Sequence, residues 1–186
     1  MKKSISILVL LVLLSLGAFA QEFSLSAGGG IQFDLGIPIQ DGVDGVGYQI
    51  GGFGFFDATY GELDVAFGYY GQTEYELGGL NLSFSLLGKY PFYVGPVTLS
   101  PLAGARLNLP LTASYNGNKV DDFNTMDNAN IDILTGVGVD TLLGSSIYLR
   151  TQALLTFGFK QFGAPDELDT LQSIGPTIKV GIGYKF

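Results

Sequence analysis

Apolar and polar residues alternate with a period of two through most of the chain beyond residue 22. The clearest case is the final stretch, IKVGIGYKF, where apolar residues at every second position alternate with lysine and glycine. Successive side chains of a β-strand point to opposite faces, so this stretch has one apolar face and one polar or small face. The same pattern predicts eight strands, at residues 23–35, 48–60, 63–70, 80–90, 97–108, 131–140, 147–159 and 174–186. The second stretch is ambiguous, because Phe53 and Phe55 fall on the parity opposite to its other large apolar residues.

Charged residues within these stretches fall on the face opposite to the apolar one. A charge that faces lipid costs roughly 2–4 kcal/mol at the bilayer midplane, so this sorting is typical of strands that cross a membrane. We therefore predict an all-β fold, a closed eight-stranded antiparallel up-and-down transmembrane β-barrel. No stretch after the N-terminal segment is long and apolar enough to be a spanning helix.

The polar face would form an interior charge network with a structural role. The interior of an eight-stranded barrel is just wide enough to be filled by side chains, and buried charges there need partners. We expect Arg106 and Arg150 to contact at least one interior aspartate each. The predicted network consists of Asp34, Asp57, Asp64, Lys89, Arg106, Asp132, Asp140, Arg150 and Lys179, with Lys185 on the same parity.

The connections between the predicted strands alternate in length. Residues 36–47, 71–79, 109–130 and 160–173 form long connections, and residues 61–62, 91–96 and 143–146 form short ones. The long connections carry ten acidic and two basic residues. Outer-membrane barrels combine long surface loops with short periplasmic turns, so this order predicts acidic surface loops and two periplasmic termini.

The first twenty residues have the features of a cleavable signal peptide. Lys2 and Lys3 precede an apolar run over residues 5–16, and the Ala18-Phe19-Ala20 segment fits a cleavage site. The run is shorter than the ~20 residues of a membrane-spanning helix. We therefore predict a signal peptide at residues 1–20 and a single barrel domain at residues 21–186.

The composition removes most catalytic and metal-binding chemistry. The chain has no cysteine and no histidine, which excludes disulfides, thiolate sites and the commonest general base and metal ligand. The Asp- and Asn-rich segment 116–130 does not have the ligand spacing of an EF-hand loop. We expect no catalytic residue, no cofactor, no metal site and no nucleic-acid partner.

The chain resembles the small eight-stranded outer-membrane barrels, a group loosely called the OmpX/OmpA-like β-barrel superfamily. The resemblance rests on the signal peptide, the eight alternating stretches, the SLLGKYPF segment at 85–92 and the terminal GYKF. It implies a monomer surrounded by outer-membrane lipid. It also implies that Tyr184 and Phe186 form the signal read by the barrel assembly machinery. Enzymes within the group that modify lipid A are built around a catalytic histidine, which this chain lacks.

The expected function is that of an integral outer-membrane protein with a filled lumen and a structural or surface-interaction role. The sequence leaves open whether the loops bind an extracellular partner. One alternative is a narrow channel or transporter, which the interior parity of Leu87, Leu102, Leu134, Leu142 and Leu154 disfavours. The other is a soluble lipocalin-like ligand-binding barrel, which would place the apolar parity inside.

Overall fold

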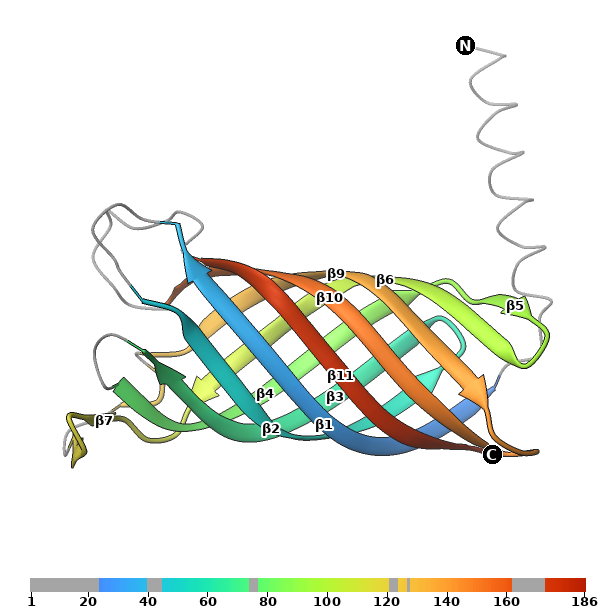
Figure 1. Cartoon of the computed structure of the whole chain (residues 1–186), viewed down its shortest axis with the longest axis horizontal. Helices are drawn as coiled ribbons and strands as arrows, with labels where there is room; N and C mark the ends of the chain where they lie inside the picture. Colours follow the sequence, from blue (N-terminus) through green and yellow to red (C-terminus); the bar gives the residue numbers. More distant parts are fainter. Residues whose placement is uncertain (1–23, 40–44, 74–76, 121–123, 127, 162–172) are drawn as a thin grey trace, which may run out of the picture.

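The computed structural model describes residues 24–39, 45–73, 77–120, 124–126, 128–161 and 173–186, with only the backbone of residues 160 and 161. Every regular element in these residues is a β-strand (Figure 1). Three short strands, β5 (Phe92–Val94), β7 (Ser114–Tyr115) and β8 (Asn118–Lys119), lie in the connections. The eight long strands are β1 (Leu25–Pro38), β2 (Gly47–Ala58), β3 (Gly61–Gln72), β4 (Leu77–Lys89), β6 (Val97–Pro110), β9 (Asn130–Leu142), β10 (Ile147–Gln161) and β11 (Ser173–Lys185).

The long strands form a closed antiparallel barrel. Each pairs with the next long strand along the chain, and β1 pairs with β11 to join the two ends of the sheet. In that last pairing Gly29 lies opposite Ile182 and Phe33 opposite Ile178. The predicted eight-stranded closed barrel is therefore confirmed, whereas the predicted signal peptide lies outside the described residues.

The barrel has two distinct ends, which Figure 1 shows at the left and the right. We call the left one, where β1, β3, β6 and β10 finish, the long-loop end. The right one, the short-turn end, holds β5 and the C-terminus. The favoured two-residue hairpins need positive φ at the first central position (type II′) or at both (type I′). This explains Gly95 (φ 62°) between β5 and β6, and Asn116-Gly117 (φ 50° and 76°) between β7 and β8.

The apolar parity of the strands lies on the outside of the barrel. Ile31, Leu86 and Ile182 are 69, 66 and 58% exposed, although they lie within long strands. Inside the barrel, Asp64 and Lys179 have no exposed surface. The arrangement confirms the predicted alternation. A water-soluble barrel has its apolar side chains inside and its charged ones outside, and here the two are exchanged. The structure also resolves β2, because Phe53 and Phe55 are buried in the interior and Ile50 and Phe56 are exposed.

Three local predictions differ from the structure. The turn between β2 and β3 lies at residues 59–60 and not at 61–62, because Ala58 pairs with Gly61 and Asp57 with Glu62. Leu142 and Lys185 keep their interior parity but are exposed. Each is the last residue of its strand, β9 or β11, and lies at the rim of the short-turn end.

Candidate functional site

The candidate site is the charged interior of the barrel, together with a cavity at its long-loop end. The nine residues of the predicted network all point inward, and together with Glu62 they divide into three groups. Each group contains at least one cationic side chain paired with carboxylates.

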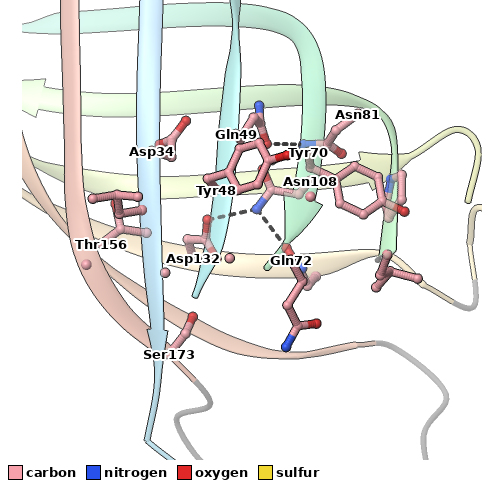
Figure 2. Close-up of a pocket in the computed structure, with 18 of the residues that line it drawn as sticks. Asp34, Tyr48, Gln49, Tyr70, Gln72, Asn81, Asn108, Asp132, Thr156 and Ser173 are labelled. Atoms are coloured by element: carbon pink, nitrogen blue, oxygen red, sulfur yellow. Dashed lines mark hydrogen bonds between the residues drawn. The ribbon is translucent and has the colours of Figure 1, made fainter. Parts of the chain in front are cut away.

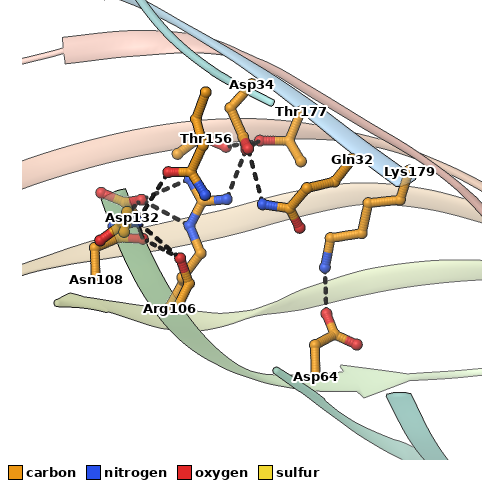
Figure 3. Close-up of polar contacts among 12 residues, drawn as sticks. Gln32, Asp34, Asp64, Arg106, Asn108, Asp132, Thr156, Thr177 and Lys179 are labelled. Carbon is orange, nitrogen blue, oxygen red and sulfur yellow. Dashed lines mark hydrogen bonds and ion pairs between the residues drawn. The ribbon is translucent and has the colours of Figure 1, made fainter. Parts of the chain in front are cut away.

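The first group surrounds Arg106, which β6 carries into the half of the lumen nearer the long-loop end (Figure 3). Its Nε and Nη2 donate to Asp132 Oδ2 at 2.9 and 2.7 Å, and its Nη1 donates to Asp34 Oδ1 at 2.6 Å. Thr177 and Gln32 also donate to Asp34, which holds that carboxylate in place. One guanidinium is thus shared by two buried carboxylates.

The second group surrounds Arg150 at the short-turn end. Its Nε and Nη2 donate to the two oxygens of Asp140 at 2.8 and 2.7 Å, and its Nη1 donates to Glu62 Oε2 at 2.7 Å. Arg150 and Lys89 both pair with Asp57. The guanidinium also lies 4.3 Å from the centre of the Phe55 ring, within the range of a cation–π contact. The inward aromatic residue of β2 therefore supports a buried cation.

The third group fills the section between the other two. Lys179 of β11 pairs with Asp64 of β3, and neither side chain has exposed surface (Figure 3). The Lys179 ammonium lies 5.4 Å from the centre of the Phe53 ring. A cluster of buried leucines lies in the interior as well, formed by Leu87, Leu102, Leu134 and Leu154. Apolar packing and an ion pair together occupy the width of the barrel here.

Glu62 is the network residue that the sequence reasoning missed. Its side chain is 1% exposed and accepts hydrogen bonds from Arg150 and Gln152. Placing the turn at 61–62 removed this residue from the strand. The signal was present, since Glu62 has the same parity as Asp64 and Ala66.

A cavity of about 370 Å³ lies at the long-loop end of the lumen (Figure 2). Arg106 and its two aspartates lie at its inner end, and amide side chains such as Gln49, Asn81, Asn108 and Asn130 line its wall. A space of about 10 Å³, large enough for about one water molecule, lies beside Arg150 and Glu62. The two spaces share no lining residue.

The C-terminal aromatic pair lies on the outside of the short-turn end. Phe186 is 74% exposed, and its backbone N–H donates to the carbonyl oxygen of Leu25 at 3.0 Å. The rings of Tyr184 and Phe186 contact each other edge to face, with centroids 5.5 Å apart. The last residue therefore continues the seam between β11 and β1, and its role in assembly stays a prediction.

The described residues hold no group of three or more acidic, histidine or cysteine side chains placed to bind a metal ion. No helix in this part of the chain is long and apolar enough to cross a membrane.

Similarity to known proteins is confined to structure. No family model and no curated protein matches the chain. Neisserial surface protein A superposes with a TM-score of 0.55 at 16% identity, covering 89% of this chain and all of that one. A major outer membrane protein of Thermus thermophilus gives 0.51 at 14% identity, again covering 89% of this chain and all of that one.

This chain has the fold of the small outer-membrane β-barrels. At these identities the likeness establishes the architecture of the chain and not its activity, which depends on the chain's own residues.

Proposed function

We propose that this protein resides in the outer membrane, with lipid around the barrel and a structural or surface-interaction role without catalysis. The observation that carries the proposal is the apolar exterior. Among the described side chains of the long strands, no charged residue has the exterior parity, while residues such as Ile31 and Leu86 are more than half exposed. Water is a poor solvent for such a surface, and hydrocarbon is a good one.

A soluble lipocalin-like barrel would need the opposite arrangement. Its apolar parity would line the interior, and its charged parity would face water. In this protein Asp64, Arg150 and Lys179 are at most 2% exposed. The interior is too polar and too full to serve as the apolar cavity of such a carrier.

The absence of histidine and cysteine from the chain supports a role without catalysis. The described buried carboxylates of the network are each paired with arginine or lysine inside the barrel. We propose that the acidic long connections face the exterior of the cell and provide the surface for an extracellular partner. The termini would then be periplasmic, and Tyr184 with Phe186 would be read by the barrel assembly machinery.

The placement in a membrane is tested by fractionating cells that express the full chain. We expect the mature protein in the outer-membrane fraction after carbonate extraction. We also expect it to migrate faster on a detergent gel before boiling than after, because a closed barrel stays folded in detergent. Recovery as a soluble periplasmic protein would overturn the proposal.

A narrow channel is the second candidate function, and the cavity at the long-loop end is the observation that favours it. The cavity does not continue through the section filled by the Lys179–Asp64 pair and the leucine cluster. The geometry therefore supports a closed lumen better than an open one.

A further inference from the structure

We propose that the cavity at the long-loop end binds a small polyhydroxylated molecule the size of one sugar ring, either uncharged or carrying an amino group. Binding there does not depend on the placement of the barrel in a membrane. It would give the protein a ligand in addition to its structural or surface role.

The size of the cavity sets the size of the ligand. Small-molecule sites usually measure about 300–1,000 Å³, so a cavity of about 370 Å³ is near the lower limit. The ring of Tyr70 lines one side of the cavity, and its hydroxyl donates to the carbonyl oxygen of Thr112 at 3.0 Å. This bond ties the segment after β6 to the barrel wall and holds one side of the cavity in place.

The wall offers hydrogen-bond donors and acceptors side by side. Asn108 donates to Asn130 Oδ1 at 2.7 Å and to Asp132 Oδ2 at 2.8 Å, so hydrogen bonds link these three side chains along the wall. A hydroxyl group both donates and accepts, and it fits such a mixed surface better than a group with only one capacity. The residues therefore favour a ligand with several hydroxyls over an apolar one.

One amide pair has unused hydrogen-bonding capacity. Asn81 Nδ2 donates to Gln49 Oε1 at 2.8 Å, but Asn81 Oδ1 and Gln49 Nε2 have no partner among the described residues. The two side chains are 4 and 9% exposed and both line the cavity (Figure 2). Buried polar atoms are nearly always paired, and one hydroxyl could accept from Gln49 and donate to Asn81. Both atoms are buried, so a ligand reaches them only if the two side chains rotate toward the cavity.

The charge at the inner end selects against anions. Arg106 pairs with both Asp34 and Asp132, so this group has one carboxylate more than it has cations. All the hydrogen bonds that Asp132 accepts from the described residues reach Oδ2, which leaves Oδ1 without one. An ammonium group would be attracted to this end of the cavity, and a carboxylate would be repelled.

Three probes of equal size and different charge test the proposal on the purified, folded barrel in detergent micelles. D-Glucose is neutral, D-glucosamine is cationic and D-glucuronate is anionic at mildly acidic pH. We expect saturable shifts of the backbone amide NMR signals of Asn81, Asn108 and Asn130 with glucosamine, weaker binding of glucose and no binding of glucuronate. The ligand is either a free monosaccharide or the terminal sugar of a glycan chain. Maltotriose distinguishes the two, because only a cavity that takes the end of a glycan chain would bind it.

A matched pair of glycine variants locates the binding. A Cβ on Gly36, which lines the cavity, would meet only Ser173 at an ordinary 3.8 Å, so Gly36→Leu adds a side chain to the cavity without a backbone clash. Gly52→Leu adds the same side chain on the exterior, where the nearest atom is 3.6 Å away. We expect Gly36→Leu to abolish the saturable shifts and Gly52→Leu to retain them, with heat-modifiable migration showing that both variants fold. The absence of saturable binding of glucose and glucosamine to the unaltered protein, or equal binding to Gly36→Leu, would overturn the proposal.

Discussion

At the scale of single residues, the barrel buries cations among carboxylates. Arg150 is 2% exposed and pairs with Asp57, Glu62 and Asp140. Removing one partner of a buried ion pair leaves the other charges without compensation, which typically costs about 3–5 kcal/mol. The three carboxylates around Arg150 would repel one another without it, and Lys89 alone would remain to offset them.

We predict that Arg150→Leu lowers the free energy of unfolding by roughly 3–5 kcal/mol. Urea unfolding of the barrel in lipid vesicles measures this change. Lys185→Leu is the matched control, because Lys185 is exposed and has no ion pair among the described residues. The control should stay within about 0.5 kcal/mol of the unaltered protein. An equal effect of both substitutions would show that the Arg150 network does not stabilise the fold.

At the scale of strands, glycines that face the interior allow the backbones of neighbouring strands to approach each other closely. A Cβ on Gly30 would lie 2.0 Å from the carbonyl oxygen of Val180 and 2.4 Å from the Cα of Gly181, both of them backbone atoms of β11. The seam between β1 and β11 closes the barrel, so this close approach lies where closure is decided. On the exterior, Gly52 has its nearest neighbour 3.6 Å from the same built position.

We predict that Gly30→Ala destabilises the barrel by roughly 1–3 kcal/mol, because the seam must widen to admit the methyl group. Gly52→Ala should be neutral or stabilising by about 0.5 kcal/mol, since it only restricts the unfolded chain. Parallel urea titrations of the two variants give the comparison. If Gly30→Ala were as stable as Gly52→Ala, the backbone crowding at the seam would not be limiting.

The last strand also carries the predicted assembly signal. Phe186 is exposed, and one backbone hydrogen bond joins it to Leu25, so its deletion removes little packing. We predict a clear loss of the protein from the outer membrane of cells and near-normal refolding of the same variant into micelles. Phe92→Ala, which removes another exposed aromatic residue at the short-turn end, serves as the control. Normal outer-membrane levels of the Phe186 deletion would contradict the assembly role.

The alternation of residues predicts the strands and their faces, because side-chain direction in a strand is a local property. It does not locate the turn at 59–60. Tyr60 continues the apolar parity of β2, and the backbone hydrogen bond from Thr59 to Ser24 involves the distant N-terminal segment. The error removed Glu62 from the network. The cavity is equally beyond local reasoning, because Gln49, Asn81 and Asn130 come together only after the barrel closes.

At the scale of the whole molecule, the lumen holds charged groups toward both ends and is filled by an ion pair and apolar side chains in its middle section. Within the part of the chain that the structure describes, six carboxylates and four cations of the ion pairs face inward, and such a set would suit an ion path if water could pass. In the middle section, Asp64, Lys179 and Leu134 have no exposed surface, and Leu87 has 1%. An ion that crosses this section would have to break the Lys179–Asp64 pair and displace packed leucines. Both steps carry a high cost in a low-dielectric interior.

We therefore predict that the purified protein shows no steady conductance in planar lipid bilayers. The matched test is the double variant Leu134→Gly with Leu154→Gly, which opens the filled section. Both leucines belong to the packed cluster, so the variant leaves the ion pairs unchanged. If the variant still folds, as judged by heat-modifiable migration, it should conduct more often than the unaltered protein. Reproducible channel steps from the unaltered protein, with a selectivity that changes in Lys89→Glu or Asp64→Asn, would establish a channel. In that case the interior charges would line an ion path, and the filled lumen would be the closed state of a gated channel.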